Sequence, residues 1–465
     1  MPTYRILTLG CKLNQADSGA LEARLVGLGL RRAPETGGAA APASDAPADL
    51  VVLNTCTVTA GADREARQLT RRLRRTHPGA TLIVTGCYAE RDGGALASLP
   101  GVDHVVGMRD QAGQVAALAA AALGLPAPPP GAPGRSEATG SAEATATAAE
   151  PLDLGRFGAT DACDPAMSDR TRAFLKIQDG CDLRCSYCII PSVRGGSRSL
   201  PGEEVLRRIA GLVAGGYREI VFTGVNTGDW GCDLSPARRL HDLLPEALVA
   251  AGPARLRLNS LEPRTVTPVI VRLLAESGGR LARHLQVPLQ SGCDTVLARM
   301  RRNYRTADYA RAVETLGGAV PDAGIGADVI VGFPGETDAE FEATWRFIER
   351  SPLAYLHVFS YSARPGTTAA ALPAVPPKAI RDRSARLRGL GRELSLRFRK
   401  RFVGRELPVL VLRGVRPDGR LRALSDNFID LGLDAGRRAE AGLENRLVTA
   451  RVSAVTGDDT LAALA

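Results

Sequence analysis

Six of the nine cysteines of this 465-residue chain fall into two groups of three. One group is compact and lies in the run DGCDLRCSYCIIP, as Cys181, Cys185 and Cys188. Three thiolates from one loop can bind three irons of a cubic [4Fe-4S] cluster and leave the fourth iron open to a ligand. The alternative is structural zinc, which usually takes a fourth Cys or His nearby. No His lies between Ser168 and Arg239, so the spacing favours the cluster.

The other three cysteines each end a β-rich apolar run: Cys11 after YRILTLG, Cys56 after DLVVLNT and Cys87 after TLIVTG. Helix-like stretches such as residues 14–30 and 62–75 follow these runs. This βαβαβ pattern predicts an α/β domain over residues 1–124, with a parallel, Rossmann- or flavodoxin-like sheet and a fourth strand near Val105. Loops after parallel strands emerge along one edge, so the three thiols can converge on a second cluster. The alternative is three independent buried cysteines, which behave as small hydrophobes.

Composition and periodicity divide the rest of the chain into three parts. Residues 125–165 are rich in Pro, Ala, Gly, Ser and Thr, which predicts a tether, and Cys163 within it has no role that we can assign. Residues 166–400 alternate strands and helices again, which predicts an open or partial (β/α)6 barrel with its site on the loops at the carboxyl ends of the strands. The six expected strands are residues 173–178, 219–223, 255–259, 284–288, 326–331 and 355–361. Residues 401–465 carry short β-rich runs between turn signals, which predicts a small β-barrel.

Four segments resemble the methylthiotransferase family of radical S-adenosylmethionine (SAM) enzymes: TLGCKLNQADS, LNTCTVTAGADREARQ, VTGCYAE and FLKIQDGCDLRCSYCIIPSVRGGSRS. The resemblance spans nearly the whole chain, and the C-terminal part is similar to the tRNA-gripping TRAM module. It implies two [4Fe-4S] clusters, an auxiliary one on Cys11, Cys56 and Cys87 and a SAM-binding one on Cys181, Cys185 and Cys188. It also implies that SAM is both the methyl donor and the radical source, and that an electron donor such as a flavodoxin or ferredoxin is a partner.

Two short segments indicate a branch of that family. GCKLN at residues 10–14 and TCTVT at residues 55–59 are similar to the branch that methylthiolates C2 of N6-threonylcarbamoyladenosine at position 37 of tRNA. GVN at residues 224–226 points the same way. The isopentenyladenosine branch more often has Gln-Met after the first cysteine, and the branch that modifies a ribosomal-protein side chain has Pro-Lys-Asn. These two branches, and a non-enzymatic tRNA-binding protein with metal at these cysteines, stay open.

The same resemblance places SAM on the loops after the second to fifth strands of the barrel. The candidate contacts are Thr223, Gly224, Asn226, Glu262, Gln290, Ser291, Gly332 and Glu336. Glycines let the backbone approach the methionyl group, and carboxylates or amides accept from ribose hydroxyls, although any single glycine can simply be a turn residue. No side-chain acid or base is expected. Arg364 is a candidate for contact with substrate or with the cofactor carboxylate, whereas Cys232 and Cys293 are not expected to be ligands.

Charge and hydropathy agree with an RNA-modifying enzyme. The net charge is +9 and the pI is about 9.3, which would attract phosphates. Residues 378–401 read as a basic helix interrupted at Gly389 and Gly391, and residues 64–75 read as a second one; the alternative for each is an arginine-rich solvated face. The chain shows no transmembrane run and no secretory pattern. Together with an odd cysteine count, this predicts a cytoplasmic protein without a membrane partner.

Overall fold

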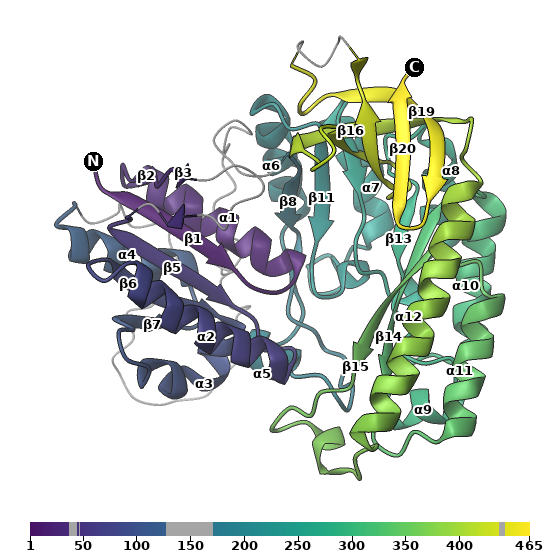
Figure 1. Cartoon of the computed structure of the whole chain (residues 1–465), viewed down its shortest axis with the longest axis horizontal. Helices are drawn as coiled ribbons and strands as arrows, with labels where there is room; N and C mark the ends of the chain where they lie inside the picture. Colours follow the sequence, from purple (N-terminus) through teal and green to yellow (C-terminus); the bar gives the residue numbers. More distant parts are fainter. Residues whose placement is uncertain (37–43, 46, 127–170, 437–441) are drawn as a thin grey trace.

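The computed structural model describes residues 1–36, 44–45, 47–126, 171–436 and 442–465. Cys163 and all but the first two residues of the predicted tether lie outside the described residues. Figure 1 shows an N-terminal α/β domain beside a larger central domain, with a small β-barrel over one end of the central strands. Within the described ranges, no helix has the length and hydropathy needed to cross a membrane.

The N-terminal domain is built on a parallel five-stranded sheet. Its spatial order is β2 (Arg31–Arg32), β1 (Thr3–Thr8), β5 (Leu50–Thr55), β6 (Thr81–Gly86) and β7 (His104–Val106). The central strand β5 is buried at every residue, as expected for a parallel strand covered on both faces. A short antiparallel pair, β3 (Glu35–Thr36) and β4 (Ser44–Asp45), lies outside this sheet. The predicted Rossmann- or flavodoxin-like sheet is confirmed.

Four helices cover the two faces of this sheet. α1 (Lys12–Gly27) and α4 (Gln111–Leu123) contribute Leu21 and Val115 to one apolar cluster. α2 (Ala60–Thr76) and α3 (Cys87–Ala97) contribute Leu73 and Leu96 to the other. α2 begins cleanly after Thr59, whose side chain accepts a hydrogen bond from the backbone nitrogen of Ala62. In the chain, α1, α2, α3 and α4 follow β1, β5, β6 and β7. The loops between these strands and helices therefore lie at the carboxyl edge of the sheet.

The central domain contains six parallel strands in two groups of three. The first group is β8 (Ala173–Lys176), β11 (Glu219–Thr223) and β12 (Arg255–Arg257), and the second is β13 (His284–Gln286), β14 (Gly324–Val331) and β15 (Tyr355–Ser360). An isolated parallel bridge between Leu256 and Leu281 links the groups, and the backbone nitrogen of Leu261 donates to Gln286 at 3.0 Å. Six strands follow one another in chain order, so the predicted partial barrel is confirmed.

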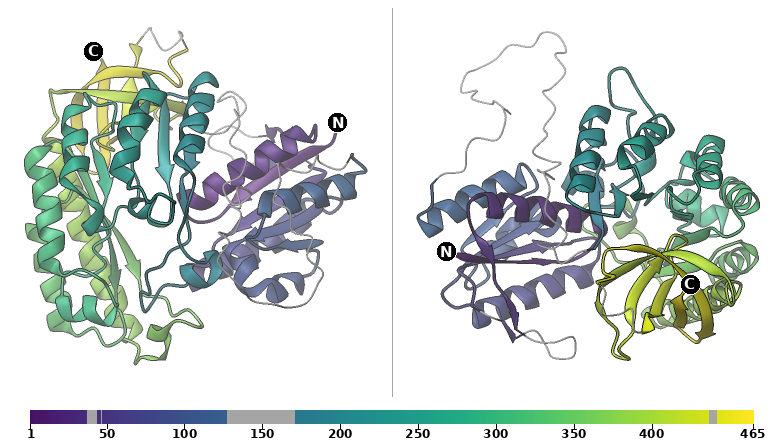
Figure 2. Two further views of the ribbon diagram at one scale, coloured as in Figure 1. Left: turned by 180° about the vertical axis from the view of Figure 1, so that it is seen from behind. Right: turned by 90° about the horizontal axis from the view of Figure 1, so that it is seen from above.

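Helices form the outer layer of this partial barrel (Figure 2). They are α6 (Gly202–Ala214), α7 (Leu240–Ala251), α8 (Pro268–Glu276), α10 (Thr306–Ala319), α11 (Asp338–Arg350) and α12 (Pro377–Lys400), with the short α5 (Ile190–Arg194) and α9 (Asp294–Arg299) in loops. One continuous apolar core joins the strands to these helices.

The basic helix α12 corrects one prediction. The interruption expected at Gly389 and Gly391 is wrong, because α12 runs unbroken from Pro377 to Lys400. Gly391 packs against β15, where an added Cβ would lie 3.3 Å from the Cβ of Leu356. Each glycine costs a helix about 1 kcal/mol relative to alanine, but burial of a stripe that includes Leu390 outweighs this cost.

The C-terminal part is a closed five-stranded barrel, which confirms the predicted small β-barrel. Its strands are β16 (Glu406–Val415), β17 (Leu421–Ser425), β18 (Asp430–Asp434), β19 (Leu447–Thr456) and β20 (Asp459–Leu464), in the spatial order β16-β17-β18-β20-β19. The loop between β17 and β18 meets the central domain: Arg257, the last residue of β12, donates to the carbonyl of Asp426 at 2.9 Å, and Arg283, just before β13, donates to its carboxylate at 2.6 Å. The rings of Phe428 and His284 stack with centroids 4.3 Å apart.

Candidate functional site

The three dispersed cysteines lie at one edge of the N-terminal sheet. Cys11 and Cys56 follow the neighbouring strands β1 and β5, and Cys87 begins α3 directly after β6. Burial, together with the charges of Cys11 and Cys87, raises the pKa of Cys56 to about 12. Burial also raises the pKa of Cys87, with Cys11 adding to the effect. Cys11 therefore lies close enough to Cys56 and to Cys87 for its charge to act on both thiols.

Two glycines make this approach of the loops sterically feasible. Gly10 and Gly86 immediately precede Cys11 and Cys87 and have φ values of +100° and +98°. A Cβ at Gly10 would lie 2.6 Å from the Cβ of Cys56, and one at Gly86 would lie 2.6 Å from the backbone nitrogen of Thr55. A side chain at either position would strain the backbone and push neighbouring strand ends apart.

The three compact cysteines lie in the loop between β9 (Gln178–Asp179), which pairs with β10 (Arg198–Ser199), and α5. The backbone nitrogen of Cys188 donates to Cys185 at 3.1 Å, which folds the loop on itself. Burial raises the pKa of Cys181 to about 12 and that of Cys188 to about 11, and the neighbouring cysteines of the loop raise both. Arg302 donates to the Sγ of Cys185 at 3.1 Å. Metal binding at such buried thiols would have to release their protons.

A buried charge cluster joins the two domains beside these loops; we call Asp17, Lys176, Asp179 and Arg194 the Asp17 cluster. Arg194 pairs with Asp17 at 2.7 Å and with Asp179 at 3.0 Å. Lys176 pairs with the same two carboxylates at 2.5 and 3.2 Å. Burial alone would raise the pKa of Asp179, but Arg194 and Lys176 hold it below its ordinary value. Two cations and two carboxylates thus satisfy one another across the domain boundary.

Each dispersed-cysteine loop contacts the central domain. Lys12, next to Cys11, donates from Nζ to Oδ1 of Asn259 at 3.1 Å. Thr57, next to Cys56, accepts from Arg364 at 2.8 Å. Cys87 itself accepts from Nε of Arg194 at 3.3 Å. Asn259 follows β12, Arg364 follows β15 and Arg194 follows the compact cysteine loop, so the cysteine edge of the N-terminal sheet faces the carboxyl end of the central strands.

The predicted SAM contacts after β11 lie against the strand that leads to the compact loop. An added Cβ at Gly224 would lie 2.7 Å from Oε1 of Gln178, and the backbone nitrogen of Asn226 donates to the same oxygen at 2.9 Å. Thr223 is fully buried and its hydroxyl bonds to the carbonyl of Val221 at 3.2 Å. Asn226 donates from Nδ2 to Asp229 at 2.6 Å, while its Oδ1 is buried with no donor among the described residues.

Two further predicted SAM contacts, Glu262 and Gln290, already interact with other parts of the protein. Glu262 pairs with Arg302, which also contacts the compact cysteine loop. Gln290 has a left-handed backbone with φ of +63°, and its backbone atoms join β14.

The remaining three predicted contacts hold loops to outer helices. The Ser291 hydroxyl lies 3.0 Å from that of Thr344 on α11. Glu336 accepts from the backbone nitrogen of Gly332 and from Arg383 of α12, both at 2.8 Å. These side-chain oxygens are used within the protein.

Several interdomain contacts were not expected from the sequence. Arg364, a candidate for substrate or cofactor contact, is buried and pairs with Asp63 of α2 at 2.6 Å. The Asp17 cluster was not expected. Lys176 gave the one signal that could have revealed it, because a lysine inside the apolar strand AFLKI is rarely buried without a charged partner. Cys232 is exposed and Cys293 bonds to the hydroxyl of Thr295 at 3.2 Å.

The six cysteines and Asn226 have surroundings that suit [4Fe-4S] clusters and SAM. In the described parts of the chain, no three His, Cys, Asp or Glu side chains are arranged to hold a single metal ion as they stand. The fit to [4Fe-4S] clusters rests instead on one loop that carries three cysteines and on three strand ends that carry one each at the same sheet edge. Arg194 beside Cys87 and Arg302 beside Cys185 offset thiolate charge. For SAM, the unpaired Oδ1 of Asn226 is a suitable acceptor for an ammonium group.

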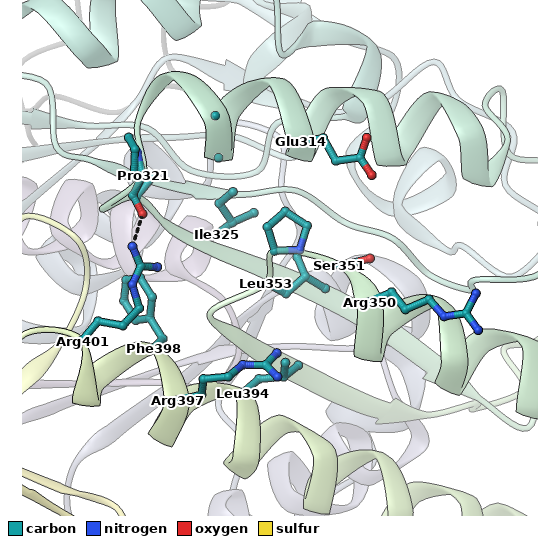
Figure 3. Close-up of a pocket in the computed structure, with 14 residues that line it drawn as sticks. Glu314, Pro321, Ile325, Arg350, Ser351, Leu353, Leu394, Arg397, Phe398 and Arg401 are labelled. Atoms are coloured by element: carbon teal, nitrogen blue, oxygen red, sulfur yellow. Dashed lines mark hydrogen bonds between the residues drawn. The ribbon is translucent and has the colours of Figure 1, made fainter.

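A separate cavity of about 510 Å³ lies on the outer side of the central domain (Figure 3). Its lining comes from α10, from the turn after α11 and from α12, and includes Glu314, Leu353 and Arg397. None of the cysteines or predicted SAM contacts lines it. This cavity is therefore distinct from the candidate site.

Comparison with known proteins defines the class. Residues 175–348 match the family model described as "Radical SAM superfamily", and residues 3–107 match "Uncharacterized protein family UPF0004". The solved structure of the radical S-adenosylmethionine methyltransferase TsrM from Kitasatospora setae is similar in fold, with a TM-score of 0.50 and 15% identity over 80% of this chain and 75% of that one. The fold and the compact cysteine loop thus define a radical SAM enzyme, a class that uses a [4Fe-4S] cluster and SAM.

Relatives of known name narrow the class to a family. "Threonylcarbamoyladenosine tRNA methylthiotransferase MtaB" of Bacillus subtilis is 35% identical over 88% of this chain and 85% of its own length. The protein of that name in Thermotoga maritima is 34% identical, over 89% and 88%. "tRNA-2-methylthio-N(6)-dimethylallyladenosine synthase" of Acidothermus cellulolyticus is 34% identical, over 94% and 83%. The chain belongs to the methylthiotransferase family of radical SAM enzymes.

Proposed function

We propose that this enzyme methylthiolates C2 of N6-threonylcarbamoyladenosine at position 37 of tRNA. One observation carries the proposal: all three dispersed-cysteine loops contact the carboxyl end of the central strands, through Lys12, Thr57 and Cys87. A sulfur source held by the first domain would then lie beside the SAM site of the second. The names of the Bacillus and Thermotoga relatives support this substrate.

The residues that would hold the groups follow from this arrangement. Cys11, Cys56 and Cys87 would hold an auxiliary [4Fe-4S] cluster, and Cys181, Cys185 and Cys188 would hold the cluster that binds SAM. When bound, these groups supply the radical that removes a hydrogen from an unactivated carbon and the sulfur that replaces it. Thr223, Gly224, Asn226, Glu262 and Gln290 would contact SAM, and Ser291, Gly332 and Glu336 would hold the surrounding loops.

The side chains of this chain contribute position rather than acid or base chemistry. The Asp17 cluster and the buried pair of Arg364 with Asp63 fix the first domain against the second at two places. The side chains of both contacts are buried, so their charges are satisfied within the protein. Such fixed placement is what a reaction between two separately held groups requires.

Exposed arginines provide a surface for tRNA phosphates. Two arginines of α2 already have partners within the protein: Arg74 pairs with Asp103, and Arg67 donates to the hydroxyl of Tyr88. The exposed arginines of that helix are Arg64, Arg71, Arg72 and Arg75. The exposed basic residues of α12 are Lys378, Arg381, Arg386, Arg388, Arg392, Arg397 and Lys400, of which Arg386 pairs with Glu342. Such unburied cations can neutralise phosphates without disturbing the fold. We infer that both helices and the C-terminal barrel contact tRNA.

The setting of the reaction follows from its chemistry. Reductive use of SAM needs an electron donor, for which a flavodoxin or ferredoxin is suitable. Clusters held by free thiols favour a reducing compartment, which supports a cytoplasmic location. In the described part of the chain all eight cysteines are free.

The test is nucleoside analysis of tRNA from cells that lack this chain. We expect the 2-methylthio form of threonylcarbamoyladenosine to disappear and the unthiolated nucleoside to accumulate, and the wild-type chain, but not Cys56→Ala, to restore it. The second candidate substrate is isopentenyladenosine, because the Acidothermus relative is as similar as the others. If only the 2-methylthio form of isopentenyladenosine disappears, the substrate is isopentenyladenosine and our proposal is wrong.

A further inference from the structure

Lys12 is a cation between the two domains without a carboxylate partner. It is the residue directly after Cys11, and it is half-buried. Its Nζ donates to the neutral amide oxygen of Asn259 at 3.1 Å and lies 5.3 Å from the centroid of the Phe428 ring. Among the described residues, no carboxylate lies within ion-pair distance of it.

The two arginines whose charges act on Lys12 both have a carboxylate partner. Arg172 and Arg257 pair with Glu219, at 3.6 and 2.9 Å. These cations are therefore committed to a structural carboxylate. Lys12 differs because its direct partner is uncharged.

The groups that face Lys12 from other elements do not change this balance. Arg172 at the start of β8 and Arg257 on β12 bring positive charge, and Glu219 on β11 and Asp328 on β14 bring negative charge. Two charges of each sign leave the ammonium of Lys12 uncompensated. Partial burial of a cation is unfavourable unless a ligand or a protein group satisfies it.

We propose that Lys12 binds the carboxylate of the threonyl group of the substrate nucleoside, and so selects this substrate over one with an apolar side group. This inference rests on the proposed function. The threonylcarbamoyl group ends in a carboxylate, whereas the dimethylallyl group named for another relative has no charge. An ammonium donating to a carboxylate makes a strong, charge-assisted hydrogen bond that the apolar group cannot form.

The neighbours of Lys12 suit such a ligand. Asn259 accepts from Lys12 through Oδ1, which leaves its Nδ2 as a donor for a second carboxylate oxygen. The Phe428 ring provides an apolar wall beside the ammonium. Lys12 also adjoins Cys11, so holding the side group here keeps the base close to the proposed sulfur source.

The competing role for Lys12 is a tether between the domains through Asn259. A tether would affect the affinity for every RNA alike, because it does not contact the side group. A carboxylate-binding residue would affect only RNAs that carry the carboxylate. The two roles therefore differ in discrimination rather than in overall affinity.

The test measures binding of the full-length, cluster-loaded enzyme to anticodon stem-loop RNAs at one fixed salt concentration, by fluorescence anisotropy. Three RNAs carry threonylcarbamoyladenosine, its neutral carboxamide analogue or plain adenosine at position 37. We expect the wild-type enzyme to bind the carboxylate RNA about tenfold to a hundredfold more tightly than the carboxamide RNA. Lys12→Gln should bind both equally, and Lys12→Arg, which keeps the charge, should retain most of the difference.

Two further variants make the outcome decisive. Asn259→Asp gives Lys12 a protein carboxylate without altering Lys12, so it should also abolish the discrimination, even if Lys12→Gln does not fold. Lys378→Gln removes one exposed lysine of α12, and any loss of affinity should be the same for all three RNAs. If the wild-type enzyme discriminates and both Lys12→Gln and Asn259→Asp still do, the inference is wrong and the proposed function stands. If the wild-type enzyme does not distinguish threonylcarbamoyladenosine from adenosine, the proposed substrate itself is wrong.

Discussion

Arg194 donates a hydrogen bond from Nε to the Sγ of Cys87 across the boundary between the central and N-terminal domains, at a distance of 3.3 Å. The same guanidinium pairs with Asp17 and Asp179, so one buried side chain joins a predicted cluster ligand to two carboxylates. Burial raises the pKa of Cys87, and the positive charge of Arg194 acts against this by favouring the thiolate. Arg194 therefore links interdomain stability to the state of the thiol.

Replacing Arg194 tests this link. Arg194→Met would leave Asp17 and Asp179 with Lys176 alone, and removing one partner of a buried ion pair costs about 3–5 kcal/mol. We expect a large fall in the free energy of unfolding and reduced iron uptake at the N-terminal cysteines, with partial rescue by Arg194→Lys. Chemical denaturation and iron analysis measure both effects. Arg207→Met is the matched control, because Arg207 pairs with Glu204 at the surface and such pairs contribute about 1 kcal/mol or less. Equal losses in the two variants would contradict the link.

Substitutions in the two cysteine groups should have different effects on the reaction products. We expect about eight irons per chain in the reconstituted wild-type enzyme and about four in either Cys181→Ala or Cys56→Ala. Cys181→Ala should release no 5'-deoxyadenosine from SAM, whereas Cys56→Ala should still release some but thiolate no RNA. Cys232→Ala, which removes an exposed thiol, should behave as the wild type. Equal loss of SAM cleavage in both cluster variants would rule out this division of roles.

The edge at which the dispersed cysteines meet could be predicted, because each cysteine follows an apolar β-rich run and parallel topology brings such ends together. The contacts of that edge with the central domain could not. Lys12 and Asn259 are 247 residues apart, and local patterns do not indicate which distant loops meet. Arg364 is a second example, because its partner Asp63 lies 301 residues away in the sequence.

Local rules also failed where packing opposed them. Gly391 reads as a helix breaker in isolation, yet the small residue is what lets α12 lie close to Leu356 of β15. Helix propensity is a weak preference of about 1 kcal/mol per glycine, and burial of Leu387 and Leu394 on the same helix exceeds it.

Glu340 should make part of the stability depend on pH. Hydrogen bonds from Arg299, at 2.8 Å, lower the pKa of Glu340 from its ordinary 4.5 to about 2. A lowered pKa stabilises the folded state when the carboxylate is ionised, so the contribution is complete above the unfolded pKa and disappears as the pH falls from about 4.5 to about 2. We expect the melting temperature of Glu340→Gln to lie below that of the wild type near neutral pH and to approach it below pH 4.5. Glu349→Gln, an exposed residue of the same helix, should show no such convergence. A difference independent of pH would contradict the ion-pair origin.

Phe428 holds the C-terminal barrel against the central strands in a backbone conformation that favours glycine. Its φ is +72°, and its ring stacks on His284 and lies 5.4 Å from the guanidinium carbon of Arg257. The left-handed conformation costs an ordinary residue about 1–2 kcal/mol, so the packing of the ring must exceed this cost.

Two substitutions at Phe428 separate the ring from the backbone. Phe428→Ala should lower the free energy of unfolding by about 2–4 kcal/mol, since it removes a partly buried ring but keeps the unfavourable φ. Phe428→Gly also loses the ring but relieves the backbone, so it should be at least as stable as Phe428→Ala, the reverse of the usual order. Phe359→Ala, at an exposed phenylalanine of β15, should cost about 1 kcal/mol or less. Chemical denaturation orders the three variants. If Phe428→Gly proves clearly less stable than Phe428→Ala, the backbone at this position is not strained. If Phe428→Ala costs no more than Phe359→Ala, the docking of the barrel depends on Arg255, Arg257 and Arg283 rather than on the ring.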